Sequence, residues 1–457
     1  MVRRQLLLSL VFGCLCFETQ AELRAALYRV EPAQSLQTVI NEAGKGDQIL
    51  LEPGVYSGNF VIDKPLTLSG RPGAILDAES RASALTLKAS NITVENLTIQ
   101  NWGTNLTDLD AGIFVGREAR CAKIRHNFFR GIASGIWVDA AENIEILNNQ
   151  IEGNPDVRSQ DRGNGIHLYA VTGAQVKGNE VWHTRDGIYI DTSNNNELID
   201  NYLHDLRYGV HYMYSHRNRL EGNHTKQTRT GYALMQSKYL TVVNNQSEND
   251  QNYGILMNFI TNSRIVGNRI SGVQTGRNPL DSRSSKTIAG AEGKAIFMYN
   301  SVFNEIVDNR FTASDLGIHL TAGSEDNVIS GNAFIGNKEQ VKYVSNRKQD
   351  WSKNGRGNFW SDYLGWDMDN DGIGDTFYEP NDGVDKLLWK YPAAKVLINS
   401  PAIETLRWVQ RQFPVFKSPG VYDSAPLMSA PQAEIINAEI SSATESQGKY
   451  ERYGQCG

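Results

Sequence analysis

Residues 187–223 read GIYIDTSNNNELIDNYLHDLRYGVHYMYSHRNRLEGN. Two asparagines in this stretch, Asn201 and Asn223, stand 22 residues apart, and two glycines that each open a short apolar segment, Gly187 and Gly209, repeat at the same interval. The asparagine recurs along the chain, mostly every 22 or 23 residues, at Asn127, Asn149, Asn179, Asn201, Asn223, Asn245, Asn268, Asn309 and Asn332. Because the asparagines and the glycines advance together, the interval indicates a structural repeat.

The repeat unit predicts strands. A unit of about 22 residues without a helical pattern fits a leucine-rich repeat or a β-solenoid, and the leucine-rich signature does not appear. Apolar residues alternate with others, as in Ile188 and Ile190 or Val210 and Tyr212, which places them on one face of a strand. Units stacked about 4.8 Å apart would let the asparagine amides hydrogen-bond along the axis. We therefore expect an all-β, right-handed parallel β-helix with about 22–23 residues in each turn, or rung.

The segments outside the repeat predict a leader, two caps and a tail. Arg3 and Arg4, an apolar stretch and a small-residue cleavage site at Ala21 are typical of a secretory signal peptide, so we expect export to the periplasm. Apolar residues at helical spacing from Ser35 to Ile40 predict a helix that caps the N-terminal end. The predicted organisation is a signal peptide (1–21), an N-terminal cap with the first rungs (22–90), the repeats (91–345) with an insertion loop (about 271–293), a C-terminal cap (346–395), an amphipathic helix and docking segment (396–430) and a disordered tail (431–457).

Charge and cysteine content narrow the possible functions. The formal net charge is -6, and it becomes -7 when the leader, which carries Arg3, Arg4 and Glu18, is removed. A negative chain has no general attraction to nucleic acid or anionic lipid, and no later apolar run reaches the roughly 18 residues of a membrane span. Cys121 and Cys456 would remain after processing, and their wide separation predicts neither a metal pair nor a disulfide framework.

A candidate copper site lies among the strand positions that alternate with the apolar core. Counting two and four residues from the repeated glycines places His211, Met213 and Met235 on one outward patch about two rungs high. Thioether and imidazole ligands together suit Cu(I), because soft sulfur favours a soft ion. The alternative is that the two methionines are surface apolar residues or are covered by the C-terminal segment.

A basic series is a candidate partner-binding surface. Arg185, Arg207 and Arg229 each stand two residues before a repeated glycine and would stack on neighbouring rungs. Like charges at that distance repel each other, so they need carboxylates, water or an anionic partner. Asp186 and Asp205 are near enough in sequence to neutralise part of the series.

The segment after the cap predicts an amphipathic helix from Ile403 to Phe413. Its apolar residues include Leu406, Trp408 and Phe413. This face would either pack on the protein's own cap or dock on a partner or membrane surface.

A second candidate metal site is rich in aspartate. Asp367, Asp369, Asp371 and Asp375 surround a glycine turn, and acidic oxygens at alternate positions are typical of calcium loops. Tyr378 occupies the position where an EF-hand would have its glutamate. We therefore expect a shorter calcium loop that ties the C-terminal cap.

A polysaccharide lyase or epimerase is the rival function, since parallel β-helices often carry such enzymes. That chemistry requires two nearby carboxylates, or a base beside neutralising groups. The outward positions offer Asp191 without a facing acid, and Asp161 and Arg162 before His167 form only a weak constellation. A scaffold that binds proteins and no metal is a third possibility, and an enzyme is not expected.

Several stretches of the chain resemble the NosD family. They are the rung from Arg207 to Ser215, the run from Gly357 to Asp375, the segment Leu388 to Pro392, and the segment Pro426 to Met428. The resemblance covers nearly the whole mature chain and implies a periplasmic maturation factor for the nitrous-oxide reductase NosZ. It also implies action beside an ABC transporter made of the NosF ATPase and the NosY membrane subunit, with copper supplied by the lipoprotein chaperone NosL. The assignment of His211, Met213 and Met235 as ligands rests on register and not on a family motif.

Overall fold

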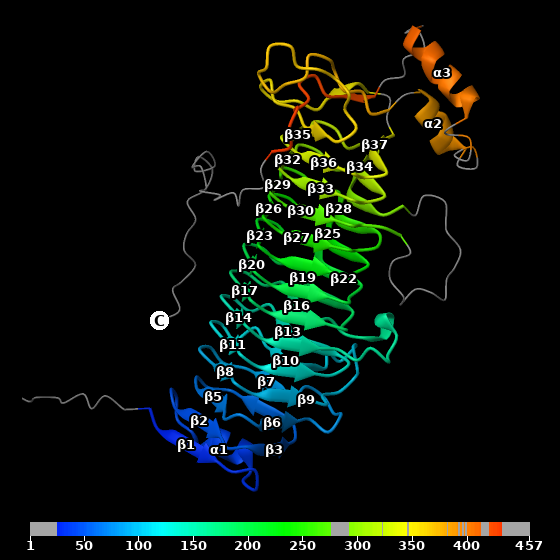
Figure 1. Ribbon diagram of the computed structural model, residues 1–457. Coiled ribbons are helices and arrows are strands. Elements are labelled where there is room, and N and C mark those ends of the chain that lie inside the picture. The colour runs from blue at the N-terminus through cyan, green and yellow to red at the C-terminus, as the bar shows by residue number, and fades with distance from the viewer. Residues whose placement is uncertain are drawn as a thin grey trace, which may run out of the picture.

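The computed structural model describes residues 25–275, 292–412 except 322, 345, 346, 382, 392, 393, 395, 396, 398 and 399, and 420–431. Three long parallel sheets wind into a β-solenoid, in which each rung contributes one strand to each sheet (Figure 1). The predicted parallel β-helix is confirmed. We call the three sheets A, B and C in the order in which a rung of the repeat passes through them.

Sheet A has 13 strands, which are β1 (Leu27–Val30), β2 (Gln48–Leu51), β5 (Thr67–Gly70), β8 (Thr93–Glu95), β11 (Lys123–Arg125), β14 (Glu145–Leu147), β17 (Gln175–Lys177), β20 (Glu197–Ile199), β23 (Arg219–Glu221), β26 (Thr241–Val243), β29 (Arg264–Val266), β32 (Glu305–Val307) and β35 (Val328–Ser330). Sheet B also has 13 strands, which are β3 (Gly54–Ser57), β6 (Ala74–Asp77), β9 (Thr98–Gln100), β12 (Phe128–Arg130), β15 (Gln150–Glu152), β18 (Glu180–Trp182), β21 (Tyr202–His204), β24 (His224–Lys226), β27 (Gln246–Glu248), β30 (Arg269–Ser271), β33 (Arg310–Thr312), β36 (Ala333–Ile335) and β39 (Phe359–Trp360). Sheet C has 12 strands, which are β4 (Phe60–Ile62), β7 (Leu85–Leu87), β10 (Ala111–Val115), β13 (Ser134–Asp139), β16 (Ile166–Tyr169), β19 (Asp186–Asp191), β22 (Tyr208–Met213), β25 (Thr230–Met235), β28 (Tyr253–Asn258), β31 (Lys294–Tyr299), β34 (Leu316–Leu320) and β37 (Glu339–Tyr343).

The interior of the solenoid is the hydrophobic core. The apolar pairs predicted for the inner face of sheet C, such as Val210 with Tyr212 and Ile188 with Ile190, are fully buried. They stack in register from rung to rung, Ile188 opposite Val210 and Ile190 opposite Tyr212. The alternate positions of the same strands therefore face outward.

The asparagine ladder forms as predicted. Asn201 donates from Nδ2 to Oδ1 of Asn223 over 2.8 Å, and Asn223 donates to Asn245 over 2.9 Å. Each amide also binds the backbone of its neighbours, so that Asn223 Nδ2 donates to the Leu198 carbonyl over 2.8 Å. The ladder continues one rung beyond the predicted set, because Asn332 Nδ2 donates to Asn358 Oδ1 over 2.9 Å.

A short helix and a folded-back segment close the two ends. At the N-terminal end the side chain of Ser35 caps α1 (Leu36–Glu42), which buries Leu36 and Ile40 against the first rungs. At the other end β38 (Gln349–Asp350) pairs with β40 (Val421–Tyr422), which belongs to a segment far along the chain. These caps cover the open ends, where exposed sheet edges would invite association with other chains.

The C-terminal cap is built around a buried aspartate. Asp423 is fully buried and accepts hydrogen bonds from Trp360 Nε1 over 2.8 Å and from the Asn358 backbone over 2.7 Å. Two helices, α2 (Gly383–Lys390) and α3 (Pro401–Gln412), lie between the cap strands in sequence and stand beside the end of the solenoid (Figure 1).

Other predicted segments lie wholly or partly outside the described residues. They are the signal peptide, most of the insertion loop, Phe413 and the tail beyond residue 431. Cys121 takes part in a disulfide bond, which the wide separation of Cys121 and Cys456 in sequence did not predict. Spacing along the sequence does not reveal which cysteines meet, because pairing depends on where the chain folds back.

Candidate copper site and relatives

The candidate copper ligands lie on three outward positions of sheet C. Tyr189 of β19 pairs with His211 of β22, and His211 pairs with Ala233 of β25. Met213 stands two residues after His211, and Met235 two residues after Ala233, so the methionines occupy equal positions on adjacent strands. Both methionine side chains are half-buried. The backbone register thus places the three predicted residues on two adjacent strands, β22 and β25.

His211 is less accessible than the outward position suggested. Its side chain is only 11% exposed, because the ring stacks on Tyr189 with centroids 4.3 Å apart and meets the edge of Tyr208 at 4.9 Å. The Nδ1 atom of His211 lies 3.0 Å from Oδ2 of the buried Asp186. An imidazole that donates Nδ1–H to a carboxylate keeps its Nε2 lone pair, which is the arrangement of most metal-binding histidines.

Asp186 also holds Arg207. The guanidinium donates two hydrogen bonds to the Asp186 carboxylate, from Nε over 2.8 Å and from Nη2 over 2.6 Å. Burial alone would raise the pKa of Asp186, but the hydrogen bonds from His211 and Arg207 hold that pKa below its ordinary value. Arg207 therefore has a carboxylate partner within the chain, whereas partner binding by Arg185 and Arg229 stays a prediction.

The sequence showed Asp186 one residue before a repeated glycine but did not show the contact that it makes. Its carboxylate lies 3.0 Å from the side chain two residues after Gly209, on the next rung. Partial neutralisation of the arginine series by Asp186 was predicted, whereas the contact between Asp186 and His211 was not. It depends on side-chain direction across two strands, which spacing alone does not give.

A stack of rings continues from His211 toward the N-terminal end of the solenoid. Trp137, His167 and Tyr189 follow one another on successive rungs, with ring centroids 3.8 Å and 4.6 Å apart. Burial lowers the pKa of His167 to about 3, so its ring is neutral, and its Nδ1 atom lies 3.2 Å from the Asn164 amide. His167 stands two residues after Gly165, the outward position that His211 holds two residues after Gly209, and the sequence does not reveal its burial.

The weak enzyme constellation does not assemble. Arg162 donates to three backbone carbonyl groups, those of Val157, His183 and Pro155. Asp161 forms an ion pair with Arg158 at 2.7 Å. Both residues are therefore engaged in holding their own loop, and neither is bonded to His167.

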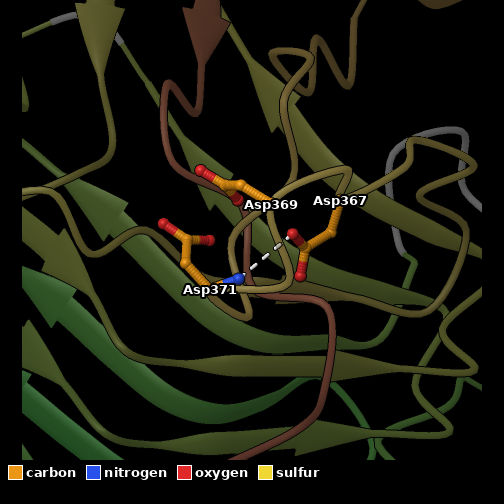
Figure 2. Close-up of side chains that lie close together, drawn as sticks. All are labelled: Asp367, Asp369 and Asp371. Atoms are coloured by element: carbon orange, nitrogen blue, oxygen red, sulfur yellow. Dashed lines mark hydrogen bonds between the residues drawn. The ribbon is translucent and has the colours of Figure 1, made fainter.

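The three first aspartates of the acidic loop come together. Oxygen atoms of Asp367, Asp369 and Asp371 lie within 4.8 Å of one another, and the Asp371 backbone donates to Asp367 (Figure 2). The neighbouring Asp371 charge raises the pKa of Asp369 above its ordinary value. The fourth predicted ligand, Asp375, accepts a hydrogen bond from the Met368 backbone over 2.7 Å and is not part of this cluster. Hard oxygen ligands of this kind fit Ca²⁺.

The amphipathic helix α3 packs within the chain through part of its surface. Ile403 of α3 packs against Val384 and Leu388 of α2, so one face of the helix is used within the chain. Leu406 and Trp408 remain 47% and 58% exposed. Among the residues that the structure describes, no helix has both the length and the hydropathy to span a bilayer.

Comparison with known proteins identifies the family. The chain is 58% identical over 412 residues to a Pseudomonas aeruginosa protein named "Probable ABC transporter binding protein NosD", which covers 90% of this chain and 94% of that protein. The chain belongs to the NosD family. A Stutzerimonas stutzeri NosD of the same name is 54% identical over 403 residues, which is 88% of this chain and 92% of that protein.

Sequence profiles agree with membership of the NosD family. Residues 147–365 match the family described as "Periplasmic copper-binding protein (NosD)", and residues 30–191 match a family of unknown function, DUF1565. Among solved structures, the A-module of the Azotobacter vinelandii mannuronan C-5 epimerase AlgE6 superimposes with a TM-score of 0.52 at 15% identity over 71% of this chain and 93% of that chain. At this identity the likeness shows the fold alone. The NosD relatives are named as binding proteins and not as enzymes.

Proposed function

We propose that this chain is a periplasmic maturation factor for the nitrous-oxide reductase NosZ. It acts without enzymatic activity of its own, beside the NosF/NosY transporter, and receives copper from the chaperone NosL as cargo. The observation that supports the proposal is the contact between His211 and Asp186, because an imidazole that donates Nδ1–H to this carboxylate keeps Nε2 for a metal. Met213 and Met235 stand on the same two adjacent strands, β22 and β25. The names of the relatives and the copper-binding description of the family support the same function.

The donor set favours Cu(I). One imidazole and two thioethers are soft, uncharged ligands, and they leave a position for a ligand from a donor or acceptor protein. Asp186 fixes the orientation of the imidazole, while Arg207 balances the carboxylate charge. A site of this kind binds a monovalent soft ion without attracting Ca²⁺ or Mg²⁺, which need oxygen ligands.

Titration of the mature protein with Cu(I) against a chromogenic chelator tests the site. His211→Ala, Met213→Ala and Met235→Ala are each expected to lower the Cu(I) affinity on the order of tenfold or more, as losses in metal sites do. His224→Ala and Met428→Ala change a histidine and a methionine elsewhere on the surface and should leave the affinity unchanged. If all five variants bind Cu(I) with equal affinity, both alone and with NosL, the copper patch is wrong.

We also propose that the exposed face of α3 docks on NosY. Leu406 and Trp408 are 47% and 58% exposed, whereas Ile403 of the same helix is buried against α2. Trp408→Ala should reduce co-purification with a NosF/NosY complex on the order of tenfold, because exposed tryptophans dominate many interfaces. Trp366→Ala alters another exposed tryptophan, in the cap, and serves as the control. Undiminished co-purification of Trp408→Ala would contradict the docking.

The acidic loop is proposed to bind Ca²⁺ as a structural ion. Ca²⁺ would relieve the repulsion between Asp369 and Asp371, so saturating Ca²⁺ should raise the thermal midpoint of unfolding. The expected rise is about 4 °C when the Ca²⁺ concentration is about 1,000 times the dissociation constant. Asp369→Asn should abolish most of this rise, and Asp326→Asn, an acidic residue outside the loop, should preserve it. An equal midpoint with Ca²⁺ and with a chelator would refute the calcium site.

A further inference from the structure

The seven turns from sheet C to sheet A between β13 and β32 follow one plan. Each of these seven has five residues, of which the first and the fourth take a left-handed backbone, as in the turn 214–218 with φ of 50° at Tyr214 and 55° at Arg217. The next turns repeat the pattern, with φ of 56° at Phe259 and 59° at Phe303. Glycine, asparagine and aspartate tolerate this conformation, whereas bulky side chains are rare in it.

Four consecutive rungs nevertheless place an aromatic residue at one of these two positions. They are Tyr214, Tyr239, Phe259 and Phe303, which alternate between the first and the fourth position. In the three preceding turns the same positions hold Ala140, Asn143, Ala170, Gly173, Thr192 and Asn195, which also have positive φ. We name the four aromatic residues together with Tyr299 the aromatic ridge.

Burial within the chain does not explain the aromatic ridge. The five side chains are exposed by 51% (Tyr214), 48% (Tyr239), 48% (Phe259), 58% (Phe303) and 42% (Tyr299). The ridge extends over four rungs, about 14 Å along the axis at one strand spacing per rung. Clustered apolar side chains on a surface mark a site of interaction, and the unfavourable backbone conformation strengthens that inference.

The ridge adjoins the candidate copper patch and has a basic rim. Tyr214 follows Met213 directly, and the turn after Met235 contains Lys238 and Tyr239. The Arg217 guanidinium lies 5.1 Å from the ring of Tyr239. Burial, Lys238 and Arg217 together lower the pKa of His216 in the same turn, as expected where positive charge gathers.

We propose that the aromatic ridge is the docking surface for the protein that donates Cu(I), a folded partner with an apolar face rimmed by carboxylates. This assignment of the partner rests on the proposed function. Aromatic anchors inside a charged rim are the usual composition of a protein interface, and the basic rim selects an acidic partner. Phe259 and Tyr299 meet edge to face at 76°, so they do not form the flat platform on which a sugar ring would stack. Docking here places the donor's metal beside Met213 and Met235.

Replacement by asparagine separates docking from a structural role. Asparagine already occupies the equivalent positions Asn262 and Asn300, so Phe259→Asn and Phe303→Asn should maintain or raise the thermal midpoint. The doubly substituted full-length mature protein should bind purified copper-loaded NosL at least about tenfold more weakly, the loss typical of removing central aromatic anchors. Phe377→Asn changes an exposed phenylalanine of the cap and should leave the affinity for NosL unchanged.

The rim is tested in the same binding assay. Arg217→Glu with Lys238→Glu should slow association with NosL at low salt, on the order of tenfold, and the difference should shrink at high salt. The proposal would be overturned if the asparagine variants bound NosL with unchanged affinity, or if their thermal midpoint fell while their affinity for NosL did not. It would also be overturned if the variants bound anionic phospholipid vesicles more weakly but NosL normally.

The two proposals fail separately. If His211, Met213 and Met235 bind Cu(I) and the ridge variants bind NosL normally, the docking surface is wrong and the copper patch stands. If the Cu(I) titration shows no effect of those residues while the ridge variants lose NosL, the docking surface stands and the copper patch is wrong.

Discussion

Asn223→Ala is expected to lower the free energy of unfolding by about 3–5 kcal/mol, because it leaves several buried polar groups without partners at once. Asn223 is fully buried. Its Oδ1 accepts from the backbone and the side chain of Asn201 over 3.1 Å and 2.8 Å. Its Nδ2 donates to the Leu198 carbonyl over 2.8 Å and to Asn245 over 2.9 Å. Alanine can replace none of these contacts, and the buried groups cannot reach water.

The effect should be strongest near the substituted rung. In a solenoid each rung contacts only its neighbours, so a weak rung divides the cooperative unit. Denaturant unfolding measures the loss, and hydrogen exchange should show faster exchange of amides in β20, β23 and β26 than in β5 or β8. Gln246→Ala removes an exposed amide from β27, on the rung after Asn223, and should cost less than about 0.5 kcal/mol of the free energy of unfolding. A loss for Asn223→Ala no larger than that of this control would contradict a stabilising role of the ladder.

Asp186→Ala is expected to cost about 3–5 kcal/mol at neutral pH, the range for breaking a buried ion pair by removing one partner. Asp186 is 1% exposed, and its loss leaves the Arg207 guanidinium and His211 Nδ1 without their carboxylate. The same substitution should weaken Cu(I) binding on the order of 10- to 100-fold, because the imidazole loses the group that orients it. Chemical denaturation and the Cu(I) titration measure the two effects.

The stability effect of Asp186 has a defined pH dependence. The folded pKa of this carboxyl lies below its unfolded value, which is about 3.9 for an ordinary aspartate. The folded state therefore binds the proton less readily, and the contribution to stability is complete above the unfolded pKa. As the pH falls through the folded pKa the contribution is lost, so wild type and Asp186→Asn should converge in stability only below about pH 4.

A matched variant separates this effect from ordinary surface charge. Glu221→Ala breaks a half-exposed pair with Arg219, 2.7 Å apart, and should cost less than about 1 kcal/mol with little effect on Cu(I). An Asp186→Ala variant that behaves like Glu221→Ala in both measurements would show that the buried carboxylate neither stabilises the rung nor orients His211.

The repeat could be predicted because equivalent residues stack on each other between every pair of adjacent rungs. Asn201 and Asn223 stand one rung apart, and an amide ladder can form only if each rung returns to the same place. Val210 and Tyr212 alternate with outward residues, which identified the core face before the register was known. The ends were less predictable, since the cap depends on Asp423 and β40, which return to the last rungs from far along the chain.

The candidate site was predicted in outline only. Counting residues from Gly209 brought His211 and Met213 to one outward face, and the structure places them there on β22. The accessibility of His211 was overestimated, because rings on successive rungs lie close enough to stack and cover one another. The aromatic ridge was missed altogether, although counting five and eight residues from each repeated glycine would have found Tyr214 and Tyr239.

The period, the core and the asparagine ladder could be predicted from residue types, because each depends on residue type at a fixed interval. The contacts of the outward side chains depend on how neighbouring rungs pack, which residue types do not show. Asp186 and His211 are 25 residues apart in sequence and meet because β19 and β22 are neighbours. Arg207, the residue before β22, also binds the Asp186 carboxylate. A repeat determines the backbone position of each side chain, whereas burial, stacking and hydrogen bonding between rungs determine which side-chain atoms remain free to bind.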